Sequence, residues 1–137
     1  MCRAALFSAL LVTAWSLTKG MDCPSIPIPL AEAVVEAHGC MTKMGRPVKN
    51  EEYDKVQSFL MQCAERQQPG SSNPLVFLMM ACSDAKYLDG TADCMFGQEE
   101  AIFKELNLAP ADKQGGDLVF KCLKDFHEDL VKKRRKP

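Results

Sequence analysis

Residues 73–82 read Asn-Pro-Leu-Val-Phe-Leu-Met-Met-Ala-Cys, and from Leu75 to Cys82 this stretch contains no polar residue. Asn73 is a favourable N-cap, and Pro74 suits the first position of a helix. No further helix breaker follows until Gly90, so the pattern predicts a central helix and not a strand. Eight consecutive apolar residues also predict that this helix is buried on all sides.

Amphipathic segments flank this run on both sides. Three prolines in residues 23–29 indicate an extended lead-in, and residues 67–72 and 89–91 are expected to form a loop and a turn. No segment alternates apolar and polar residues over five or more positions, so the sequence predicts an all-α fold, a small bundle of about five helices. The predicted helices begin near Leu30, at Asn50, at Pro74, near Gln98 and near Gly115.

The first 20 residues have the pattern of a secretory signal peptide. A short basic start is followed by an uncharged apolar core from Ala4 to Ala14 and then by small residues. The core is too short to span a bilayer. We expect cleavage after Gly20, or alternatively after Ala14. Residues 21–137 are then expected to form a single disulfide-stabilised helical domain in an extracellular protein.

The charge of the mature chain argues against nucleic acid as a partner. Removal of residues 1–20 leaves 15 basic and 18 acidic residues, a net charge of −3. Residues 21–131 carry 10 basic and 18 acidic residues, and the other five basic residues lie in the tail at 132–137. An acidic body does not suit a phosphate backbone. The basic tail suits contact with anionic surfaces, and it equally suits a solvated end or a processing site.

Six cysteines remain after removal of the signal peptide, which takes away Cys2. An even number of cysteines in a small exported chain predicts disulfides, here three, without specifying which cysteines pair. The absence of any C-x-x-C pair argues against a zinc site. The predicted disulfide cysteines are Cys23, Cys40, Cys63, Cys82, Cys94 and Cys122.

No pattern in the chain predicts catalysis. The serines lie in no nucleophile elbow, so we expect neither enzymatic activity nor a cofactor. His38 and His127 would form a metal site only if the first and last helices met there, and ordinary hydrogen-bonded histidines are the simpler expectation. We therefore assign no metal ligand.

Methionines and phenylalanines are numerous in the predicted helices, and flexible thioethers can line an adaptable apolar cavity. Phe77, Met79 and Met80 in the central helix are the candidate ligand-binding residues. The alternative is that these side chains simply fill the core.

The cysteine spacing resembles that of a known family. Cys94 and Cys122 are separated by 27 residues that contain an acidic amphipathic helix, a break and a second helix, and Cys40 and Cys63 enclose 22 residues with a similar pattern. This resembles the microplusin-like secreted proteins of ticks, which are helical, have six cysteines, and act as antimicrobial polypeptides by binding copper. The histidine-rich ends to which that copper binding is attributed have no counterpart here, so no metal ligand is carried over.

The sequence therefore predicts a secreted, non-enzymatic binding protein, monomeric, of the host-defence (antimicrobial-like) or effector type. One alternative is an extracellular carrier of small hydrophobic ligands, as in the odorant-binding proteins. Another is a venom or salivary toxin acting on a host protein. The expected partner is accordingly a small apolar ligand or a host or microbial target.

Overall fold

The computed structural model describes residues 23–135, so the predicted signal peptide and the last two residues of the basic tail lie outside the described part. Residues 23–135 form six α-helices and one short 3₁₀-helix, with no strand among them, which confirms the all-α prediction with one helix more than expected. The elements are α2 (Leu30–Gly39), η1 (Cys40–Met44), α3 (Asn50–Gln67), α4 (Pro74–Ser83), α5 (Ala85–Phe96), α6 (Glu99–Leu106) and α7 (Pro110–Arg135).

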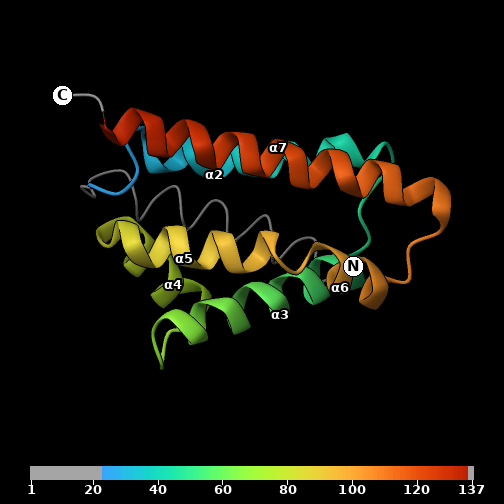
Figure 1. The fold of residues 1–137 in the computed structure, drawn as a ribbon, viewed down its shortest axis with the longest axis horizontal. Coiled ribbons are helices and arrows are strands. Elements are labelled where there is room, and N and C mark those ends of the chain that lie inside the picture. Colours follow the sequence, from blue (N-terminus) through green and yellow to red (C-terminus); the bar gives the residue numbers. More distant parts are fainter. Residues whose placement is uncertain (1–22, 136–137) are drawn as a thin grey trace.

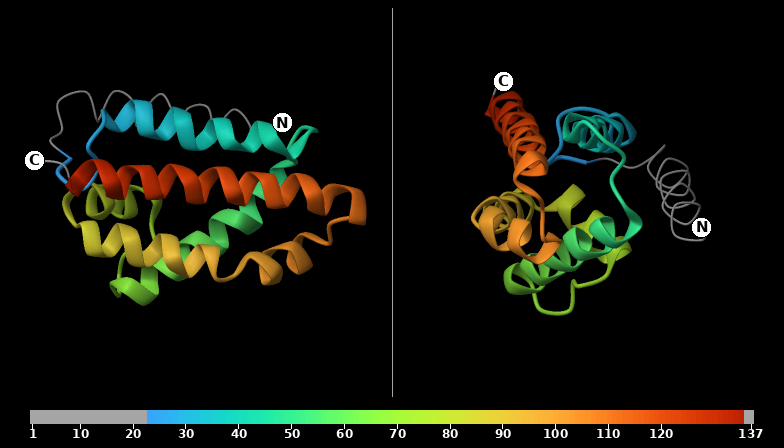
Figure 2. Two further views of the ribbon diagram at one scale, coloured as in Figure 1. Left: turned by 45° about the horizontal axis from the view of Figure 1, so that its top comes forward. Right: turned by 90° about the vertical axis from the view of Figure 1, so that its right-hand side faces the viewer.

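The helices form two layers. The long helix α7 lies beside α2 and η1 in one layer, and α3, α4, α5 and α6 make up the other (Figure 1). The two views of Figure 2 show the same division. The contact of α7 with η1 is the most extensive between any two elements of the described chain, and α3 packs chiefly on α5.

Among residues 23–135, three groups of buried apolar side chains hold the helices together. One lies between the lead-in, α2 and α7, around Leu30 and Leu130. A second lies between α6 and α7, where the rings of Phe103 and Phe120 meet edge to face with their centres 5.5 Å apart. The third, where α3, α4 and α5 meet, is formed by Ala64, Ala81 and Tyr87.

The three predicted disulfides are confirmed, and the structure supplies their pairing. Each joins residues far apart in the sequence, with separations of 59, 82 and 31 residues, so together they connect the lead-in to α4, η1 to α7, and α3 to α5. The pairs are Cys23–Cys82, Cys40–Cys122 and Cys63–Cys94.

The prediction of one uninterrupted helix from Pro74 to Gly90 is wrong, because α4 ends at Ser83 and α5 begins at Ala85. At Asp84 the backbone is extended (φ −130°, ψ 104°), and the carboxylate of this residue accepts a hydrogen bond from the amide of Tyr87 at 3.2 Å. Aspartate is a favourable N-cap, so it starts a new helix, α5. The predicted turn at 89–91 is also wrong, since Gly90 and Thr91 lie inside α5.

The last helix begins earlier than predicted, at Pro110 and not near Gly115. Gly115 and Gly116 lie inside α7 at its closest approach to other elements. A Cβ atom at Gly115 would lie 2.3 Å from the backbone oxygen of Met44 in η1, and one at Gly116 would lie 2.8 Å from the ring of Phe103. The two glycines therefore mark a close helix crossing and not a helix start.

Candidate functional site

The central helix α4 is not buried on all sides, contrary to the prediction. The exposed fractions of Leu75, Val76 and Met79 are 55%, 36% and 55%. Ala81, on the opposite side, is buried, and so is Cys82 at the end of the helix, where it is bonded to Cys23 of the lead-in. The reason is that α4 packs on α5 and α3 with the side that carries Ala81, which joins Ala64 and Tyr87 in the core. Its other side presents an apolar surface, which we call the α4 face: Leu75, Val76 and Met79.

The three residues predicted to bind an apolar ligand do not lie on one surface. Phe77 and Met80 are partly buried and pack on the core group that contains Tyr87, whose ring centre lies 5.9 Å from that of Phe77. Met79 belongs to the α4 face. A ligand held by Phe77, Met79 and Met80 together therefore stays a prediction.

The start of α4 is capped, and its end is joined to the lead-in. At the start, the side-chain oxygen of Asn73 accepts a hydrogen bond from the amide of Leu75 at 2.9 Å. At the end, the Ser25 hydroxyl donates to the carbonyl of Cys82 at 2.6 Å, and the same cysteine forms the disulfide with Cys23. The α4 face is thus presented by a capped helix whose end is covalently joined to the lead-in, which limits the entropy lost when it contacts a partner.

The residues that flank the α4 face in sequence, between Arg66 and Lys86, are polar and carry little charge. Ser72, Asn73, Ser83 and Asp84, which flank the face in sequence, are exposed. Between residues 67 and 85 there is no lysine or arginine, and Asp84 is the only acidic residue. The face therefore has an uncharged apolar centre with mainly neutral polar residues at its ends.

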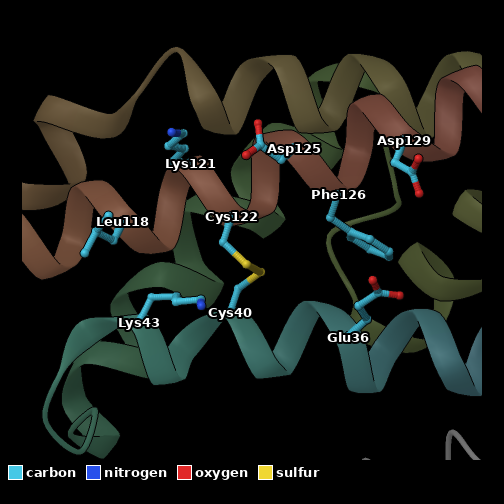
Figure 3. A pocket seen from close by; sticks show the side chains of 9 residues that line it. All are labelled: Glu36, Cys40, Lys43, Leu118, Lys121, Cys122, Asp125, Phe126 and Asp129. Carbon is cyan, nitrogen blue, oxygen red and sulfur yellow. A yellow bond between two sulfur atoms is a disulfide. The ribbon is translucent and has the colours of Figure 1, made fainter.

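An open groove with a volume of about 450 Å³ runs along the junction of α2 and η1 with α7 (Figure 3). The Cys40–Cys122 disulfide crosses its middle, and the ring of Phe126 points into it from α7. The lining residues are Glu36, Cys40, Lys43, Leu118, Lys121, Cys122, Asp125, Phe126 and Asp129. We call this the α2–α7 groove.

Opposite charges gather at the two ends of the α2–α7 groove. Lys43 and Lys121 lie toward the end with Leu118, Glu36 and Asp129 lie at the other end with Phe126, and Asp125 lies between them near Cys122 (Figure 3). Asp129 forms an ion pair with Lys133 at 3.0 Å and raises the pKa of that lysine, with smaller contributions from Glu36 and Glu32. The other charged lining residues have no ion-pair partner within residues 23–135: Glu36, Lys43, Lys121 and Asp125.

Sequence reasoning missed this groove, although part of the signal is present. Leu118, Cys122, Asp125 and Asp129 repeat at spacings of three and four, which places them on one face of a helix. The pairing of Cys122 with Cys40 is what brings that face opposite α2, and the sequence does not specify this pairing.

A charged cluster connects α5 to α7. Arg134 donates two hydrogen bonds to the carboxylate of Asp89, at 2.5 and 3.1 Å, and the Nε2 atom of His127 lies 2.8 Å from the same carboxylate. Burial favours a raised pKa for Asp89, but the hydrogen bonds from Arg134 and His127 outweigh it and hold that pKa below its ordinary value. Arg134, counted in the basic tail from the sequence, is therefore part of a structural contact.

The two histidines have different surroundings. His127 belongs to the cluster with Asp89, whereas the ring of His38 stacks parallel to that of Tyr53 with centres 6.5 Å apart. Within the described part of the chain, no group of three or more histidine, cysteine or acidic side chains lies close enough together to hold a metal ion.

Three disulfides indicate an oxidising compartment. Between residues 23 and 135, no helix has both the length and the apolar character needed to cross a membrane. Comparison with protein-family models, with curated proteins and with solved structures found no match to this chain, so the resemblance to the microplusin-like proteins stays an expectation.

Proposed function

We propose that this chain is a secreted, non-enzymatic binding protein of the effector type, which acts by docking the α4 face onto another protein. The observation that supports this most directly is the exposure of Leu75, Val76 and Met79 on a capped helix whose end is joined to the lead-in by a disulfide. Export is supported by the predicted signal peptide and by the three disulfides.

The composition of the α4 face suits a protein interface. Complete burial of a leucine, valine or methionine side chain is worth about 1.5–3 kcal/mol, so these three residues offer a partner a substantial gain on contact. A leucine and a flexible methionine can adapt to the partner's shape. An apolar centre bordered by polar residues is the usual arrangement of such interfaces.

The partner we propose is a different protein and neither a membrane nor a second copy. Surfaces that bind anionic membranes carry lysine and arginine beside their apolar residues, and residues 67–85 contain none. Stable homodimers bury large apolar surfaces, whereas the α4 face consists of three large side chains. A face of this size matches the energetically dominant centre of an interface with another protein.

The test replaces the apolar side chains without disturbing the core. The double variant Leu75→Asp/Met79→Asp changes two exposed residues, and Val35→Asp, at a residue of α2 that is 58% exposed, is the matched control. A photo-crosslinking amino acid introduced at position 79 first captures the partner from the extracellular fluid, so that the partner can be identified. The purified partner is then titrated with each variant. We expect the double variant to bind at least about 30-fold more weakly and Val35→Asp to bind like the wild type.

Three results would contradict the proposal. The first is unchanged affinity of the double variant for the purified partner. The second is self-association of the wild type that Leu75→Asp abolishes, measured by sedimentation. The third is binding to phosphatidylcholine vesicles with the same dependence on Leu75 and Met79. The identity of the partner then distinguishes a host-defence role from that of a toxin.

A further inference from the structure

We propose that the α2–α7 groove is a second binding site, which takes a short peptide in extended conformation. The peptide's amino terminus lies beside Glu36, and its carboxylate lies at the end of the groove that carries Lys43 and Lys121. The groove lies in the layer formed by α2 and α7, and the α4 face belongs to a helix of the other layer (Figure 1). The proposal therefore does not depend on the docking of α4.

The dimensions of the groove suit a peptide of four or five residues. Its volume of about 450 Å³ falls within the range of small-ligand sites, about 300–1,000 Å³. The lining residues of α7 run from Leu118 to Asp129, which at about 1.5 Å per residue corresponds to a length of roughly 16 Å. An extended peptide spans at most about 3.3–3.6 Å per residue, so four or five residues fill this length.

The charges of the groove specify a ligand with one charge at each end. Lys43 on η1 and Lys121 on α7 offer two cations toward one end of the groove, and neither forms an ion pair among residues 23–135. Glu36 on α2 offers an anion at the far end, where Asp129 is already paired with Lys133. A ligand with a single charge complements one end only. A zwitterionic peptide complements both, and charge complementarity of this kind also fixes the ligand's direction.

The middle of the groove favours a peptide with apolar side chains at its central positions. The Cys40–Cys122 disulfide crosses the middle, and the Phe126 ring points inward (Figure 3). Leu118, which lies at the lysine end, is 48% exposed and offers further apolar surface. Contact with these groups removes apolar surface from water on both partners.

The test uses the oxidised protein and the pentapeptide Ala-Leu-Phe-Leu-Ala with free termini. We expect saturable binding by calorimetry, with amide chemical-shift changes in α2, η1 and the 118–129 part of α7. Acetylation of the peptide's amino terminus or amidation of its carboxyl terminus should each weaken binding by about fivefold, because each removes one charge contact.

Variants of the protein provide the second arm of the test. Lys43→Glu/Lys121→Glu should weaken binding of the free peptide by at least about fivefold and should abolish its sensitivity to amidation. Lys113→Glu, which changes an exposed lysine of α7 outside the groove, is the matched control and should bind like the wild type. Leu75→Asp/Met79→Asp should also bind the peptide normally, which separates this site from the α4 face.

Any of four results would overturn the proposal. One is the lack of saturable binding at millimolar peptide. Another is equal affinity for the free peptide and the peptide blocked at both ends. The third is unchanged affinity in the Lys43→Glu/Lys121→Glu variant. Binding of dodecanoate in place of the peptide would also reject it, because a ligand with one charge would then suffice.

Discussion

At the scale of single residues, the clearest electrostatic contact is that between Arg46 and Glu52. Arg46 donates two hydrogen bonds to the Glu52 carboxylate, at 2.8 and 2.9 Å, and the amide of Lys49 donates a third at 2.9 Å. Arg46 also lies 3.3 Å from the carboxylate of Asp112. The hydrogen bonds from Arg46, more than the opposing effect of burial, hold the pKa of Glu52 below its ordinary value. This contact joins the loop after η1 to the first turns of α3 and α7.

The Glu52 contact predicts a pH-dependent stability. Since the pKa of Glu52 is lowered on folding, its contribution is fully present above the unfolded-state pKa of about 4.3 and is lost as the pH falls through the lower folded-state pKa. Glu52→Gln should lower the free energy of unfolding by about 2 kcal/mol at neutral pH, and the difference from the wild type should shrink in acid. Urea denaturation at neutral and at acid pH measures the free energy of unfolding of the wild type and the variant. Glu51→Gln, at an exposed neighbour, is the control. A difference that does not vary with pH would contradict this assignment.

At the scale of helices, the crossing of α7 over η1 depends on the lack of a side chain at Gly115. An added methyl group would lie 2.3 Å from the backbone oxygen of Met44, and a backbone atom cannot rotate away as a flexible side chain can. The close contact between these two elements therefore requires glycine at this position, although glycine inside a helix is usually unfavourable.

Gly115→Ala should therefore destabilise the protein by about 3 kcal/mol, by forcing α7 away from η1. Gly39→Ala is the matched control, because no atom lies within 4 Å of the added methyl group and the backbone of Gly39 is helical. It should be neutral or stabilising by up to about 1 kcal/mol. Thermal and urea denaturation of both variants measure the contrast, and equal stability of the two would show that the crossing is not tight.

The break between α4 and α5 depends on the Asp84 side chain. Asp84→Ala removes the acceptor of the Tyr87 amide and should cost about 1 kcal/mol of stability, the usual value for loss of an N-cap. Asp93→Ala, at an exposed position inside α5, is the control and should change stability by less than about 0.5 kcal/mol. If both variants behave alike in denaturation, the capping contact does not determine where α5 begins.

At the scale of the whole molecule, the disulfides restrict the unfolded chain. The Cys40–Cys122 bridge closes the longest loop, with a sequence separation of 82 residues, and Cys63–Cys94 closes the shortest, with 31. On the chain-entropy account, removal of the longer bridge by paired serine substitutions should cost about 4.5 kcal/mol, against about 3.7 kcal/mol for the shorter. Urea denaturation of the two double variants measures how much stability each loses and therefore which bridge contributes more. The reverse order would mean that side-chain packing around each bridge in the folded protein outweighs the effect of loop length.

The sequence by itself determined the features that depend on neighbouring residues. Helical spacing predicted the all-α class, Asn73 and Pro74 correctly marked the start of α4, and the even number of cysteines predicted three disulfides. Local patterns failed at two places. Asp84 lies in a run of helix-forming residues but ends one helix and caps the next, and the glycine pair in α7 suggested a helix start but marks a packing contact.

Only the tertiary structure decided which surfaces stay exposed and which residues meet. Nothing in the uniformly apolar run from Leu75 to Cys82 distinguishes its buried side from its exposed one, because that depends on where α3 and α5 lie. The α2–α7 groove likewise exists because Cys40 pairs with Cys122. Which of the six cysteines pair depends on which helices pack together, and the sequence pattern does not specify that. Both proposed binding surfaces therefore arise from contacts between segments far apart in the chain, which local patterns do not encode.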